Sequence, residues 1–251
     1  MANGRRTGAV QPNKPMNPPA YAIACCLLAF TTGCERVGPP KCPHGAAPLT
    51  AADTPTSYAS PSIYSRYFPR DVLDSGEIGP FAAGWWVGKL RDFHEAPLPS
   101  RAADQEAHEY RVMTLPSLMV TGDSVITVRR DTHGAILKSK RSILCADGLD
   151  DGLATLVETR QVDAGTWRTI AECMDRAFWS APLDDGVTGF DGVTTLVEGV
   201  RDGKYRVVHR WSLTYSDTEP ARRELLGCLS TLENAAGWRG PRVLPPMLRV
   251  R

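Results

Sequence analysis

The most informative part of this chain is VTTLVEGVR-DG-KYRVVHRWSL, residues 193–213. Two apolar-rich runs flank the dipeptide Asp202-Gly203. A two-residue Asp-Gly loop is typical of a type I′ turn, because both of its residues must adopt positive φ. The stretch therefore predicts a β-hairpin in which Arg201 faces Lys204.

This register assigns every side chain of the hairpin to a face, since alternate residues of a strand point to opposite sides of a sheet. Glu198 then lies opposite Val207. The apolar face is predicted to hold Leu196, Glu198, Val200, Tyr205, Val207, His209 and Trp211. The other face is basic, and we expect it to be solvated; it holds Thr195, Val197, Arg201, Lys204, Arg206, Val208 and Arg210.

Glu198 is the most informative side chain on the apolar face. A carboxylate in apolar surroundings is costly unless it is paired, so we expect a bond to Tyr205, His209 or Trp211. In one interpretation Glu198, His209 and Tyr205 form a catalytic acid–base cluster. The favoured alternative is a satisfied structural network, because buried polar groups are normally just paired.

Outward from the hairpin, periodicity predicts a helix over 81–94 and strands over 109–120, 124–130, 135–144 and 153–160. A further amphipathic helix over 164–179 follows Asp163 as its cap. The last helix opens at Thr218-Glu219-Pro220 and ends at Gly237. The predicted fold is α+β: an antiparallel sheet of about five or six strands with two or three helices packed on one face.

Composition excludes several classes of function. The 251 residues carry 29 Lys+Arg and 28 Asp+Glu, a net charge of +1, so no basic surplus indicates nucleic-acid binding. The five His are scattered, and Asp184, Asp185 and Asp191 lack the spacing of a calcium-binding loop. We find no cofactor, metal or phosphate motif, and no motif that specifies a reaction.

The N-terminus has the features of an export signal. Residues 1–19 hold three basic residues and no acid, and the apolar run AYAIACCLLAF (20–30) is shorter than the roughly 20 residues that span a bilayer comfortably. The following Thr31-Thr32-Gly33-Cys34 resembles the lipobox of bacterial lipoproteins, although Thr31 stands where an aliphatic residue is usual. The resemblance implies lipidation of Cys34 after cleavage, and Glu35 favours the outer membrane. A plain secretory signal or an uncleaved anchor is the alternative.

These boundaries give four segments: a signal peptide over 1–33, a Pro-rich tether over 34–80, the α+β domain over 81–239 and a tail over 240–251. The tether is expected to contain one docked segment around its aromatic cluster. Export permits disulfides. Four Cys of the mature chain that remain beside Cys34 allow three pairings. Cys173 and Cys228, both on predicted amphipathic helices, are a candidate pair; two small buried apolar side chains are the alternative.

The hairpin also resembles a family of uncharacterised bacterial proteins, many described only as lipoproteins. The shared residues are Asp191-Gly192, Leu196-Val197-Glu198-Gly199, Gly203-Lys204-Tyr205 and Arg210-Trp211-Ser212, preceded by Phe178-Trp179. The similarity extends over residues 85–238 and implies no specific activity. Members often carry His and Pro where this chain has Arg206 and Leu213, and an aromatic, His-rich segment where it has Thr114-Leu115-Pro116-Ser117. An activity at those positions would be lost or changed here.

The sequence thus favours a non-enzymatic envelope lipoprotein, bound to the membrane through its lipid anchor, that binds or scaffolds an envelope protein. This reading predicts an exposed apolar or aromatic patch on the domain. One alternative is an envelope hydrolase using Glu198 and His209. Another is a soluble secreted module with an unlipidated Cys34.

Overall fold

A computed structural model describes residues 46–48, 61–74, 78, 80–117, 122–144, 153–187, 189, 192–213 and 217–238. The chain divides into two units, residues 1–37 and 38–251, and every described residue belongs to the second. The expected signal peptide, Cys34 and the tail over 240–251 lie outside the described residues, as does Asp191.

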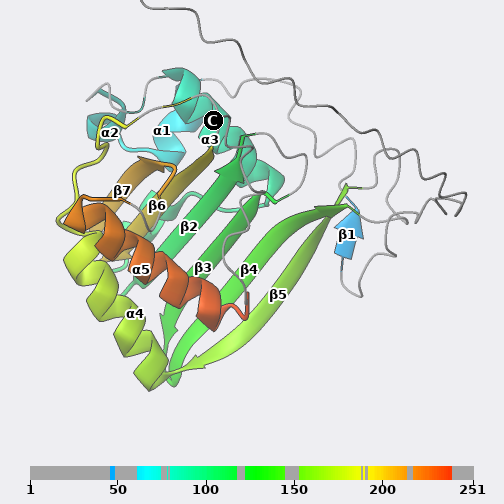
Figure 1. Cartoon of the computed structure of the whole chain (residues 1–251), viewed down its shortest axis with the longest axis vertical. Helices are drawn as coiled ribbons and strands as arrows, with labels where there is room; N and C mark the ends of the chain where they lie inside the picture. The colour runs from blue at the N-terminus through cyan, green and yellow to red at the C-terminus, as the bar shows by residue number, and fades with distance from the viewer. Residues whose placement is uncertain are drawn as a thin grey trace, which may run out of the picture. The chain divides into compact units, whose positions relative to one another are not determined.

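The core of the described chain is an antiparallel sheet in the order β1-β5-β4-β3-β2-β6-β7 (Figure 1). Six strands are long, and the three-residue β1 pairs at the outer edge of β5. The α+β class and the antiparallel sheet are therefore confirmed. The strand bounds are Ala46–Pro48 (β1), His108–Pro116 (β2), Ser124–Asp131 (β3), Gly134–Leu144 (β4), Leu153–Asp163 (β5), Val193–Arg201 (β6) and Lys204–Trp211 (β7).

The β6–β7 hairpin has the predicted register. Arg201 pairs with Lys204 and Glu198 with Val207. The loop residues Asp202 and Gly203 have φ of 51° and 71°, the left-handed values that a type I′ turn requires. On its other side β6 pairs with β2, so the hairpin extends the sheet at the β2 edge.

Two helices cover one face of the sheet: α4 (Ala164–Ala177) and α5 (Pro220–Ala235) run side by side across it (Figure 1). The Asp163 carboxylate caps α4 by accepting from the backbone N–H groups of Gly165 and Thr166. This face is the one expected to be solvated, and that expectation is wrong: Val197 and Val208 are fully buried beneath the helices. The amphipathic helices need an apolar partner surface, and the valines between the arginines provide it.

The opposite face is covered in part by α1 (Pro61–Tyr67), α2 (Arg70–Asp74), α3 (Pro80–Asp92) and the 3₁₀ helix η2 (Leu98–Ala103). Trp86 and Leu90 of α3 are buried against Leu196 and Val207 of the hairpin. Two of the three predicted helices, α4 and α5, thus pack on one face as expected, whereas α3 packs on the opposite face. Phe68 is fully buried in the same cluster. The folded unit therefore begins before residue 81, because burial of this aromatic ring fixes part of the Pro-rich segment to the sheet.

Candidate functional site

The Glu198 carboxylate lies at the centre of a buried ionic network. Its register partner across β2 and β6 is Arg111, whose Nε donates to Glu198 Oε2 at 2.7 Å. The Tyr205 hydroxyl donates to Oε1 at 2.8 Å. Glu198 is 1% exposed and Arg111 2%. The predicted bond to Tyr205 is formed, whereas the ion pair with Arg111 was not foreseen.

A second carboxylate extends this network. Glu95, after the end of α3, lies 3.5 Å from Arg111 Nη1 and 2.6 Å from Lys140 Nζ on β4. Arg111 Nη1 also donates to the Ala96 carbonyl at 2.7 Å. The cluster contains two cations and two carboxylates, so its formal charges balance. Such neutrality is what allows charged groups to remain buried.

The protonation chemistry of the network is governed by these contacts. Burial by itself would lower the pKa of Arg111, but the facing Glu198 carboxylate outweighs this effect and raises the pKa above its ordinary value. Burial raises the pKa of Tyr205 well above its ordinary value, and the Glu198 charge adds to the rise. The guanidinium therefore stays charged and the phenol stays protonated. Glu198 accepts bonds from two fixed donors, an arrangement that suits a structural anchor.

His209, the other catalytic candidate, is bonded elsewhere. Its Nδ1 lies 3.3 Å from Asp184 Oδ2, and each side chain is 20% exposed. The ring packs edge-on to Trp86, with centroids 5.9 Å apart. The structure thus places Glu198 and His209 on the same face but in separate interactions, and neither the expected Glu198–His209 bond nor the Glu198–Trp211 bond is among the hydrogen bonds of the described residues.

Three arginines connect two parts of the chain: the segment after α4 and the end of β7. Arg206 donates to the carbonyl groups of Phe178 and Ala181. Arg210 donates to the carbonyls of Pro182 and Leu183, at 2.8 and 3.1 Å. The remaining contacts join Arg210 and Arg222 to Asp185, and Arg222 to Asp217 and the Trp211 carbonyl. The basic pattern of β7 therefore serves to satisfy loop carbonyls and buried carboxylates.

A third polar cluster lies beneath α4, on the face of the sheet opposite the Glu198 network. The Tyr110 hydroxyl accepts from Trp179 Nε1 at 3.1 Å and lies 3.0 Å from His108 Nε2. Tyr110 donates in turn to Asp175, at 3.4 Å. Burial lowers the pKa of His108, and the Arg201 charge lowers it further. Burial raises the pKa of Tyr110, so this cluster favours a neutral imidazole and a protonated phenol.

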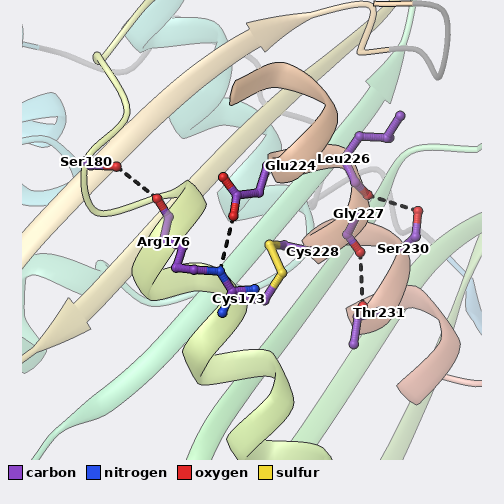
Figure 2. The surroundings of a disulfide bond; sticks show 9 residues. All are labelled: Cys173, Arg176, Ser180, Glu224, Leu226, Gly227, Cys228, Ser230 and Thr231. Carbon is purple, nitrogen blue, oxygen red and sulfur yellow. Dashed lines mark hydrogen bonds and ion pairs between the residues drawn. A yellow bond between two sulfur atoms is a disulfide. The ribbon is translucent and has the colours of Figure 1, made fainter. Parts of the chain in front are cut away.

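A disulfide joins α4 to α5. Cys173 and Cys228 are bonded, with their Cα atoms 5.5 Å apart, and Figure 2 shows the bond crossing between the two helices. Beside it, Arg176 Nε donates to Glu224 Oε1 at 3.2 Å. Cys228 is 1% exposed. The disulfide closes a loop with a sequence separation of 55 residues that includes the whole β6–β7 hairpin.

No protein-family model, curated protein or solved structure matches the chain. Within the described ranges, no group of three His, Cys, Asp or Glu side chains has the arrangement of a metal site. None of the helices in that part of the chain combines the length and apolarity needed to cross a membrane. The function must therefore be inferred from the residues and their contacts.

Proposed function

We propose that the chain is an exported bacterial lipoprotein, anchored in the outer membrane through Cys34, whose α+β domain is a non-enzymatic binding or scaffolding module of the cell envelope. The observation that carries the proposal is the Cys173–Cys228 disulfide. Disulfides persist in oxidising compartments such as the periplasm and the cell surface and are rare in the cytosol. The disulfide and the export signal at the N-terminus, read independently of each other, favour the same compartment.

The buried network supports a binding role over a catalytic one. Glu198 is almost fully buried and neutralised by Arg111, so the carboxylate is poorly placed to reach a substrate.

On the outside of α3, Phe81 is 72% exposed and Trp85 38% exposed. They lie one helical turn apart, where residues share a face. Exposed aromatic side chains grouped in this way favour contact with a partner protein.

A second candidate function is an envelope hydrolase, and the His209–Asp184 pair is the observation that favours it. A carboxylate that accepts from Nδ1 orients the imidazole and leaves Nε2 to act as a base. Glu198 would then have no direct part in the reaction. Hydrolysis of a simple ester by the full chain, abolished in His209→Gln and retained in Glu198→Gln, would favour this function over the binding module.

The anchor is tested by labelled palmitate incorporation and membrane fractionation in cells that express the full chain. We expect the wild type to take up label and to sediment with membranes. Cys34→Ala should lose both properties, because the acylated thiol is absent. Cys42→Ala is the matched control, since Cys42 lies in the same Pro-rich segment and should keep both. An unlabelled wild type would overturn the lipoprotein proposal.

A further inference from the structure

A pocket of about 440 Å³ opens at the turn end of the β6–β7 hairpin. Its volume falls within the range of small-molecule sites, about 300–1,000 Å³. It is lined by Trp179, Arg201, Asp202, Lys204, Tyr205 and Arg206. The site is separate from the Glu198 carboxylate, because the side chains of Arg201, Lys204 and Arg206 lie on the face of the hairpin opposite Glu198 and its bonded partner Tyr205.

The lining is positively charged. It contains three cations and one carboxylate, Asp202, which is 78% exposed. Lys204 is exposed and forms no ion pair with any of the described residues. Asp175 offsets part of the Arg201 charge from outside the lining. A concave surface with an excess of one charge raises the local concentration of the opposite ion.

The two guanidinium groups are held in place by the protein itself. Arg201 lies over the Trp179 ring, 5.0 Å from its centroid, and is paired with Asp175. Arg206 is fixed by the carbonyl groups of Phe178 and Ala181. Guanidinium has five N–H donors, more than these contacts use. Donors that are fixed before binding lose less entropy when a ligand arrives.

We propose that this pocket binds the oxyanion group, phosphate or carboxylate, of a small ligand. Lys204 supplies a free ammonium, Arg201 and Arg206 supply fixed N–H donors, and the Trp179 ring forms an apolar wall. The inference goes beyond the protein contact proposed for Phe81 and Trp85, because it adds a small-ligand site and names the chemical class that this site would take. Oxyanion binding depends on the pocket alone, so loss of the Cys34 anchor would leave it intact and the two proposals fail separately.

Equilibrium dialysis tests this site with the full chain in a non-ionic detergent at low ionic strength, using radiolabelled inorganic phosphate and acetate as probes. We expect saturable binding that added salt weakens. Lys204→Met should weaken it about fivefold, equivalent to about 1 kcal/mol. Asp202→Asn should strengthen it about threefold, since the repelling carboxylate is removed and Asn tolerates the positive φ of this turn position.

Lys138→Met is the matched control, because Lys138 is an exposed lysine on β4, away from the hairpin turn. It should bind as the wild type does. Tighter binding of phosphate than of acetate assigns phosphate esters as the ligand class, and the reverse assigns carboxylates. No saturable binding of either probe, or equal binding by the wild type and Lys204→Met, would overturn the site.

Discussion

Arg111 and Glu198 face each other across the paired strands β2 and β6, with Nε and Oε2 2.7 Å apart and both side chains almost completely buried. They are 87 residues apart in the sequence. The pair links β2 to the hairpin, and Glu95 extends it to Lys140 on β4. The network therefore connects the hairpin with the loop after α3 and with the far half of the sheet.

Removing one member of this pair should be costly. We expect Arg111→Met to lower the free energy of unfolding by about 3–5 kcal/mol, because Glu198 is left as an unpaired buried charge. The double variant Arg111→Met/Glu198→Met should lose less than the sum of the single variants, by at least about 1 kcal/mol. Urea unfolding measures all three. Arg129→Met, at an exposed arginine on β3, should stay within about 0.5 kcal/mol of the wild type. Additive single effects would contradict the coupling.

The disulfide should contribute strongly to the stability of the domain. A cross-link over a sequence separation of 55 residues lowers the conformational entropy of the unfolded chain, which raises the free energy of unfolding by about 4 kcal/mol. The variant Cys173→Ala/Cys228→Ala should lose about this amount in urea unfolding, and reduction of the wild type should produce a similar loss. Dithiothreitol should leave the stability of the variant unchanged. A wild type that is insensitive to reduction would show that the cross-link adds nothing.

Acid should weaken the cluster around His108. Its pKa is lower in the folded chain than the ordinary value of 6.5, because of burial and Arg201. The unfolded chain therefore binds this proton first, and the contribution of His108 to stability is complete above about pH 6.5 and falls as the pH drops through the folded pKa. We expect His108→Gln to lose less stability than the wild type between pH 7.5 and pH 5.5, measured by thermal unfolding. His133→Gln, in the exposed β3–β4 turn, should follow the wild type. Parallel pH profiles for wild type and His108→Gln would refute the assignment.

Gly199 is required by packing. A Cβ at this position would lie 2.6 Å from Phe178 Cε1 and 3.0 Å from Tyr110 Cδ1. Gly199→Ala should therefore destabilise the domain by about 1–3 kcal/mol through overpacking. Gly227→Ala on α5 is the matched control: nothing lies within 4 Å of its Cβ, and it should stabilise the helix by about 0.5–1 kcal/mol. Equal unfolding midpoints for the two variants would contradict this role of Gly199.

Local sequence patterns were sufficient for much of the fold. Asp202-Gly203 fixed the hairpin register, because a two-residue turn leaves one way to pair the strands. Asp163 marked the start of α4, because a carboxylate before an amphipathic run satisfies the first free N–H groups. Both signals act between residues that are near one another in the chain.

Long-range pairing accounts for what the sequence could not predict. Arg111 lies on a strand that the sequence predicts, but its role depends on the pairing of β6 with β2, which is distant in the sequence, in addition to β7. The basic face of β7 is predicted to face solvent because Lys204, Arg206 and Arg210 share it. Loop carbonyls satisfy Arg206 and Arg210 instead, and α4 and α5 cover Val208 between them.

Trapping of thiols in growing cells tests whether the domain folds and works in an oxidising compartment of the envelope. Cells are quenched with acid, and a mass-tagged maleimide is added before or after reduction. Before reduction, the wild type and Cys173→Ala/Cys228→Ala should carry the same number of tags; after reduction, the wild type should carry two more. A wild type that already carries the two extra tags before reduction would place both thiols in a reducing compartment and overturn the proposed location in the envelope.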